Sequence, residues 1–195
     1  MKVGTPVAIM SQTRPEWALV DIAIQTLGGI TVSIYQSLPH QEVGYLLFDS
    51  KAQIVFVENE EQAQKIAHLK ANACPIPEHE GFQACDVQIP IAHVISFEKV
   101  SALFAISLST ILNDEKLALE PPLVPAELSR DHVASYVYTS GTTGPPKGVV
   151  QTHGNHLTNV EQVSHAGVFL LDGSLFLYLP LAHSFARLAY YLSLI

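Results

Sequence analysis

Short apolar runs alternate with longer amphipathic segments through the first part of the chain. Thr13 and Glu16 have the spacing of a capping box, and apolar residues then recur at helical spacing from Trp17 to Leu27. Gly28 follows at the point where this helix is expected to end. The same alternation predicts strands at Val7–Met10, Ile30–Tyr35 and Gln53–Val57, and further helices at Pro39–Asp49 and Glu60–Leu69.

The second half of the chain continues this alternation after an irregular stretch. Residues 71–92 contain three prolines and two cysteines without a clean period, so we expect a loop there. Residues 113–130, which are rich in proline and acidic side chains, are expected to form an exposed connection. Strands are predicted at Val94–Phe97, Val133–Tyr138, Gly148–Thr152 and Leu175–Leu179. Helices are predicted at Val100–Leu112, Asn155–Val168 and Ala186–Ile195, and a turn at Pro180–His183. Thr152 or Asn155 is expected to cap the second of these helices.

Strands that alternate with helices indicate the α/β fold class. The expected architecture is a mostly parallel sheet with helices on both faces. The helix between two strands carries the chain back to the level where the first strand began, so that the next strand runs in the same direction. Ligands of such sheets bind at the carboxyl ends of the strands. Residues that follow a strand are therefore the first candidates for a functional site.

Composition narrows the class of protein. The chain has 195 residues, of which 48% are hydrophobic and 14% charged, which excludes wholesale disorder. A net charge of −8 with only 10 Lys and Arg residues disfavours a nucleic-acid-binding surface. The first residues lack the apolar core of a signal peptide, and no apolar run reaches the roughly 18–20 residues of a transmembrane helix. We expect a soluble protein of the cytoplasm.

The two cysteines, Cys74 and Cys85, lie within the predicted loop. They could form a surface disulfide, but two free thiols in a reducing cytosol are the favoured interpretation. Their spacing matches no common zinc site.

Residues 138–148, Tyr-Thr-Ser-Gly-Thr-Thr-Gly-Pro-Pro-Lys-Gly, have the composition of a phosphate-binding loop. Glycines allow backbone N–H groups to point inward, hydroxyl groups add donors, and Lys147 supplies a positive charge for a polyphosphate. The loop is not a Walker A motif, because Pro146 and Gly148 flank the lysine. The alternative is a polar hairpin turn with a solvated Lys147.

The same run closely resembles the signature loop of the adenylate-forming superfamily, which includes acyl-CoA synthetases, peptide-synthetase adenylation domains and luciferases. Further segments resemble long-chain fatty-acid–CoA ligases in the same order along the chain. These segments are residues 7–18, residues 28–38, residues 152–155 and Leu179-Pro-Leu-Ala-His-Ser-Phe-Ala-Arg187. The chain is thus identified by resemblance as part of the N-terminal AMP-binding domain of a long-chain fatty-acid–CoA ligase.

The resemblance implies a reaction and a set of site residues. ATP and a long-chain fatty acid would form an acyl-adenylate and pyrophosphate, and the thiol of coenzyme A would then displace AMP. Lys147 would neutralise the phosphates, and Mg²⁺ would bridge them near the hydroxyl of Thr139. The side chains or backbone groups that would donate to the β- and γ-phosphates are those of Thr139, Ser140, Gly141, Thr142, Thr143 and Gly144.

His183 is the candidate catalytic residue. A histidine in a turn more commonly satisfies a backbone carbonyl, but the resemblance implies that this one orients the acyl carboxylate and controls thiol access. For Arg187, one helical turn further on, a structural role in the helix is favoured over a phosphate contact. Trp17 is expected in the core, and His153 and His156 are expected to serve in capping or packing.

The resemblance also implies that much of the enzyme lies outside residues 1–195. The amino-terminal part of the AMP-binding domain, the adenine and ribose contacts, and a C-terminal domain with an assisting lysine are not matched here. These residues alone are therefore expected to be inactive. The alternatives are a ligase for another carboxylic acid, such as an aryl or amino acid, and a non-catalytic remnant that acts as an interaction module. Peripheral contact with a membrane would suit an enzyme of long acyl chains.

Overall fold

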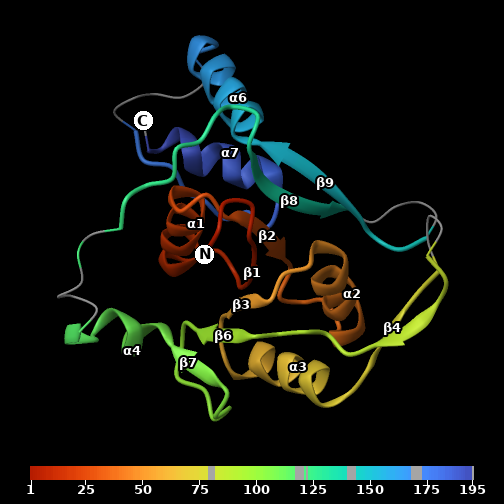
Figure 1. Ribbon diagram of the computed structural model, residues 1–195. Helices are drawn as coiled ribbons and strands as arrows, with labels where there is room; N and C mark the ends of the chain where they lie inside the picture. Colours follow the sequence, from red (N-terminus) through yellow and green to blue (C-terminus); the bar gives the residue numbers. More distant parts are fainter. Residues whose placement is uncertain (79–81, 117–120, 122, 140–143, 168–172, 195) are drawn as a thin grey trace.

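The computed structural model describes residues 1–78, 82–116, 121, 123–139, 144–167 and 173–194. Within these residues a seven-stranded sheet has the strand order β7-β6-β3-β1-β2-β8-β9 (Figure 1). The strands are β1 (Pro6–Met10), β2 (Ile30–Ile34), β3 (Ile54–Val57), β4 (Cys74–Ile76), β5 (Cys85–Val87), β6 (His93–Ser96), β7 (Ala105–Ser107), β8 (Val133–Thr139) and β9 (Lys147–Thr152). The helices are α1 (Pro15–Thr26), α2 (His40–Ser50), α3 (Glu60–Ala71), α4 (Leu108–Leu112), α6 (His153–His165) and α7 (Ser184–Leu192).

The large sheet is parallel from β7 through to β8. Only its last pair, β8 and β9, is antiparallel among the described strands, and these two strands form a hairpin. The parallel strands end at one common edge of the sheet, where ligands of this fold class bind. The prediction of an α/β fold with a mostly parallel sheet is confirmed.

Both faces of the sheet are covered by helices. Because successive residues of a strand point to opposite sides, each strand contributes side chains to the cores on both faces. In β1, Ala8 and Met10 belong to the hydrophobic core that includes side chains of α2 and α3. Val7 and Ile9 belong to a second core, which includes side chains of α1 and α7. The near-continuous apolar composition of the strand follows from this burial on two sides.

Two segments, one at the β7 edge of the large sheet and one in a separate two-stranded sheet, differ from the sequence predictions. The segment predicted as one helix, Val100–Leu112, divides into β7 and the short helix α4. Pairing of β7 with β6 supplies backbone hydrogen bonds that override the helical pattern. The stretch 71–92, predicted as a loop, contains the antiparallel pair β4 and β5. Cys74 and Cys85 lie on these strands as free thiols, as favoured from the sequence, with Cys74 buried.

The predicted capping box at the start of α1 is also wrong. Arg14 occupies the cap position without a side-chain hydrogen bond to the helix backbone, and its guanidinium pairs with the side chain of Glu16 at 2.8 Å. The hydroxyl of Thr13 instead donates to the carbonyl of Leu179 at 2.8 Å and accepts from the N–H of Leu181 at 3.1 Å. A contact with a distant part of the chain has therefore replaced the local cap.

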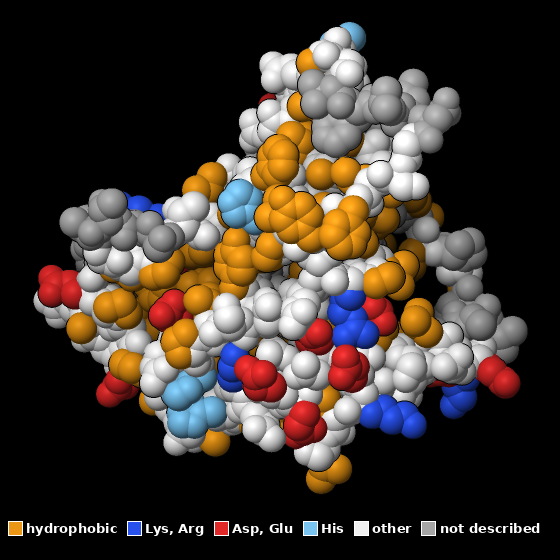
Figure 2. Space-filling view, turned by 180° about the vertical axis from the view of Figure 1, so that it is seen from behind, with side chains coloured by type: hydrophobic (Ala, Val, Ile, Leu, Met, Phe, Trp, Pro, Cys, Tyr) orange, Lys and Arg blue, Asp and Glu red, His pale blue; other side chains and the backbone are white. Residues whose placement is uncertain are grey.

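The segment Leu175–Leu179, predicted as a strand, does not pair with any described strand. Its residues Phe176 and Tyr178 are exposed, and their rings stack with centroids 6.1 Å apart. Figure 2 shows that hydrophobic side chains gather on the rear face of the molecule. Its last residue, Leu179, is bound through its carbonyl to Thr13 in the loop before α1, and Leu177 and Leu179 pack against the second core.

The end of the described chain follows the sequence prediction more closely. Thr152 caps α6 through a reciprocal capping box with Asn155, which confirms one of the two predicted caps. Helix α7 begins at Ser184, two residues before the predicted start, and lies beside α6 (Figure 1). No helix among the described residues is long and apolar enough to cross a membrane.

Candidate active site

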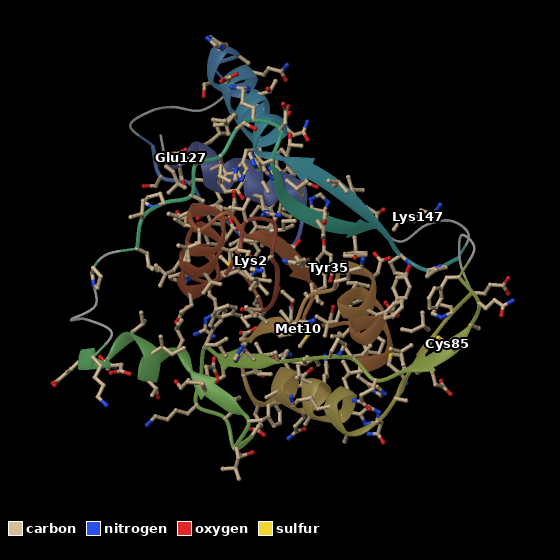
Figure 3. The ribbon with its side chains drawn as sticks, in the orientation of Figure 1. Lys2, Met10, Tyr35, Cys85, Glu127 and Lys147 are labelled. Carbon is tan, nitrogen blue, oxygen red and sulfur yellow. The ribbon has the colours of Figure 1, made fainter. Side chains whose placement is uncertain are left out.

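The phosphate loop, residues 138–148, connects the two strands of the β8–β9 hairpin. Thr139 at the end of β8 pairs with Lys147 at the start of β9, and both are exposed. Figure 3 shows Lys147 at the far end of the hairpin, away from Met10 in the middle of the sheet. The predicted site residues Ser140, Gly141, Thr142 and Thr143 lie outside the described residues. The two predicted strands on either side of the loop are confirmed, and the phosphate role stays a prediction.

Gly144 has a backbone conformation that explains its residue type. Its φ of +93° lies in the left-handed region, which side-chain-bearing residues rarely adopt. A Cβ atom added here would meet nothing within 4 Å, so the requirement for glycine comes from the backbone dihedral and not from crowding.

Tyr138 connects the hairpin to the helical layer beneath it. Its hydroxyl donates to a carboxylate oxygen of Asp49 on α2 at 2.6 Å. Burial and the neighbouring carboxylate raise the pKa of this hydroxyl, so it remains protonated and continues to donate. Its ring lies against Gly148, where an added Cβ would approach it to 3.2 Å. Tyr138 and Gly148, which flank the loop, are therefore held against α2 through the contact with Asp49.

His183 lies at the amino end of α7. Its Nδ1 accepts a hydrogen bond from the backbone N–H of Phe185 at 3.2 Å, so the imidazole caps the helix while its ring remains exposed. A ring that accepts at Nδ1 carries its proton on Nε2 when neutral. The histidine therefore presents Nε2–H as a donor to its surroundings.

The residues before His183 are attached to the same edge of the sheet as the phosphate loop. Ser33 of β2 donates to the carbonyl of Ala182 at 3.4 Å. In the sheet Ser33 pairs with Val137 of β8, two residues before Thr139. The structure thus brings the segment that carries His183 next to the strand that leads into the phosphate loop. Sequence reasoning missed both Thr13 and Ser33, which position this segment.

Behind His183, a buried polar cluster joins α7 to α1. Arg187 and Asp21 are both fully buried, and Nη2 of Arg187 lies 3.1 Å from a carboxylate oxygen of Asp21. Burial opposes the charge of the guanidinium, but Asp21 and Tyr191 together more than offset this, so the pKa of Arg187 is raised. The structural role favoured for Arg187 is confirmed by this ion pair. Trp17, predicted in the core, is fully buried with its ring 5.6 Å from the guanidinium.

Asp21 is the partner that the sequence reasoning missed. It is one helical turn from Trp17 and lies on the buried side of α1, among the apolar residues of the same face. A single acidic residue in such a stripe signals a buried partner, because an unpaired carboxylate there would be strongly disfavoured. That signal was present in the sequence, although the identity of the partner was not.

Two histidines of α6, His153 and His156, lie beside the Arg187–Asp21 cluster. They have the packing role expected of them. The Nε2 atom of His156 lies 3.1 Å from the hydroxyl of Ser135 on β8, and its ring meets Tyr191 edge-on with centroids 5.1 Å apart. Burial and the positive charge of Arg187 lower the pKa of His156 to about 4, with Asp21 partly opposing them. Burial likewise lowers the pKa of His153.

This shift predicts that acid destabilises the protein. Between about pH 6.5 and pH 4 the unfolded chain binds a proton at His156 and the folded protein does not, so stability is lost as the pH falls through this window. From pH 7 to pH 5 the contribution of this one residue is about 2 kcal/mol. Urea unfolding at both pH values should show a smaller loss for His156→Phe than for the native protein. His165→Phe, on the exposed end of the same helix, should leave the loss unchanged; equal losses in all three proteins would contradict the assignment.

No group of three or more His, Cys, Asp or Glu side chains that could hold a metal ion is found in the described part of the chain. The hydroxyl of Thr139 is exposed at the carboxyl end of β8 and is the type of oxygen donor that Mg²⁺ accepts. A metal bound here would therefore depend on phosphate oxygens and water for most of its ligands.

Comparison with known proteins agrees with this fold. The family model described as "AMP-binding enzyme" matches residues 1–195, and the chain belongs to this adenylate-forming family. A long-chain-fatty-acid–CoA ligase of Mycobacterium tuberculosis, FadD15, is 29% identical over 96% of this chain and 29% of its own length. The peroxisomal acyl-CoA ligase 891 of Penicillium roqueforti is 33% identical over 94% of this chain and 26% of its own. The chain thus spans under a third of the length of these relatives.

Solved structures share the fold at lower sequence identity. A putative long-chain-fatty-acid CoA ligase from Rhodopseudomonas palustris superposes with a TM-score of 0.75 at 18% identity, covering 98% of this chain and 42% of its own. MatB from the same organism, solved with ATP bound, gives a TM-score of 0.73 at 21% identity, covering 100% of this chain and 34% of its own. These likenesses establish the architecture of an N-terminal domain of this family.

Proposed function

We propose that the chain is part of an AMP-forming ligase that joins a long-chain fatty acid to coenzyme A. The observation that carries the proposal is the attachment of the Leu179–Arg187 segment to β2, next to the strand that ends in the phosphate loop. Two motifs far apart in the sequence thereby meet at the carboxyl edge of a parallel sheet. FadD15, the relative named above as a long-chain-fatty-acid–CoA ligase, supports the choice of acid.

In the first step, a carboxylate oxygen of the fatty acid attacks the α-phosphorus of ATP, and the bond to the β-phosphate breaks to release pyrophosphate. Donors of the phosphate loop and Lys147 would align the triphosphate and neutralise its charge, which is the main requirement of this reaction. Mg²⁺, when bound with Thr139 as a ligand, would supply further charge along the phosphates. The thiolate of coenzyme A then attacks the acyl carbon, and AMP leaves.

His183 would contact the acyl carboxylate in this scheme. Its Nε2–H is a donor suited to a carboxylate oxygen, since Nδ1 is already engaged by Phe185. The His183 ring is exposed at the start of α7, so it is accessible to a ligand. We assign it the orientation of the carboxylate and the control of thiol entry.

We further propose that residues 1–195 supply only part of the catalytic machinery. The support is their share of the relatives, about 29% of the length of FadD15. The adenine pocket and the assisting lysine would come from other parts of the enzyme. The isolated chain would therefore catalyse no adenylation.

The test is fatty-acid-dependent exchange of pyrophosphate into ATP, measured with the full-length protein and a panel of acids. We expect hexadecanoate to exceed benzoate and amino acids by at least about tenfold, because burial of a long acyl chain discriminates strongly. A preference for an aryl or amino acid would replace the substrate assignment. No exchange with any acid would favour the non-catalytic remnant, and exchange by residues 1–195 alone would contradict their incompleteness.

A further inference from the structure

The segment around His183 is attached to the rest of the domain at three points. Thr13 binds the backbone at Leu179 and Leu181, and Ser33 binds the carbonyl of Ala182. The third point follows His183: the N–H of Arg187 donates to the carbonyl of His183 at 3.2 Å, and the side chain of Arg187 ends on Asp21. The position of His183 relative to the sheet thus depends on attachments on both of its sides.

The third attachment is the most constrained of these. The carboxylate of Asp21 accepts hydrogen bonds from three elements: from Thr31 of β2 at 2.6 Å, from Gln25 of α1 at 2.9 Å, and from α7. The donors from α7 are Nη2 of Arg187 at 3.1 Å and the hydroxyl of Tyr191 at 2.9 Å. Nη2 of Arg187 also donates to the Tyr191 hydroxyl at 3.1 Å, so the two side chains hold each other in place.

A buried ion pair contributes little to stability compared with apolar residues of the same shape. Its directional hydrogen bonds, however, allow far fewer arrangements than apolar contact does. Tyr190 adds another oriented contact between the same two helices, donating to the carbonyl of Ala18 at 3.1 Å. The cluster therefore fixes the rotation and the axial position of α7 against α1, and His183 lies about one turn from Arg187 on that helix.

We propose that Arg187 and Asp21 are positioning residues that set the place of the His183 imidazole for the adenylation of the fatty acid. This proposal rests on the proposed function, in which His183 contacts the substrate carboxylate. Arg187 and Asp21 are both fully buried and do not contact substrate themselves. A change in their geometry would act first on α7, whose amino end is capped by His183.

The test is Arg187→Lys in the full-length enzyme. Both contacts of the Arg187 side chain come from Nη2, and lysine keeps the charge on a shorter, unbranched side chain whose ammonium cannot reach the position of Nη2, so it cannot serve Asp21 and Tyr191 in the same geometry. We expect kcat for fatty-acid-dependent pyrophosphate exchange to fall about tenfold, while KM for ATP changes less than about twofold. The ¹³Cε1 signal of His183, assigned through His183→Ala, should shift in the same variant. Arg130→Lys is the matched control, since Arg130 forms an exposed pair with Glu161 and should change neither quantity.

Tyr191→Phe keeps the ring and removes only the bridging hydroxyl, and it tests the proposal where Arg187→Lys does not fold. It should shift the His183 signal in the same direction and lower kcat by a smaller factor. An unchanged His183 signal and kcat in a folded variant would overturn the positioning role. Equal losses in kcat and in ATP affinity would also overturn it, because they indicate general damage. A native enzyme that activates no acid refutes the proposed function, yet the shift of the His183 signal still reports on positioning.

Discussion

Replacing Trp17 with alanine is expected to lower the free energy of unfolding by about 3–5 kcal/mol. Trp17 is fully buried between the sheet and α7, and it belongs to the core of the face that carries His183. Its removal leaves a cavity beside the guanidinium of Arg187, whose distance to the ring is 5.6 Å. The loss therefore combines apolar contact with the cation–π attraction.

Urea unfolding of the native protein and of Trp17→Ala measures this loss directly. Leu19→Ala provides the control on the same helix, since Leu19 is 50% exposed and its truncation should cost no more than about 1 kcal/mol. Similar midpoints for Trp17→Ala and the native protein would show that the core relaxes around the missing ring. They would then remove the argument that this face forms a rigid support for α7.

Much of the fold could be predicted because its signals are local. Six strands of the main sheet, β1, β2, β3, β6, β8 and β9, were predicted within a few residues of their observed bounds, because each is a short run next to a turn signal. The glycine-rich loop was also recognisable from composition alone. Parallel pairing then followed from the helices between the strands.

The errors occurred where distant residues decide the outcome. Thr13 had the spacing of a capping residue, but its hydroxyl binds backbone atoms more than 160 positions away. The pairing of β7 with β6 similarly supplied hydrogen bonds that no helical pattern could indicate. Local propensity is a weak guide wherever tertiary contacts offer a competing set of partners.

The candidate site shows the same division. His183 and Lys147 were selected from the sequence together with a resemblance, but the groups that position His183 were not. Asp21 and Arg187 are 166 positions apart, and nothing in the sequence around either residue identifies the other. A buried charge in an apolar stripe predicts that a partner exists, but the partner can be identified only from the three-dimensional structure.

Replacing His183 with alanine is expected to lower the rate of fatty-acid adenylation about 10²-fold, which is the size of effect found when one preorganised donor is removed from a reacting centre. ATP affinity should change less than about twofold, because the proposed phosphate contacts come from the β8–β9 hairpin and not from α7. Pyrophosphate exchange and equilibrium ATP binding, measured on the same preparations of the full-length enzyme, separate the two quantities. Equal losses in both would count against the assigned role.

His183→Asn distinguishes the imidazole from the helix cap. Because His183 accepts from the N–H of Phe185, alanine removes both the ring and a cap contact that is typically worth about 1 kcal/mol. Asparagine is a strong cap residue, so it should restore the stability of α7 without supplying Nε2–H at the same place. If adenylation remains as low in His183→Asn as in His183→Ala, the imidazole itself serves the reaction. Recovery of the rate with asparagine would reduce His183 to a capping residue, and the donor to the carboxylate would have to lie elsewhere.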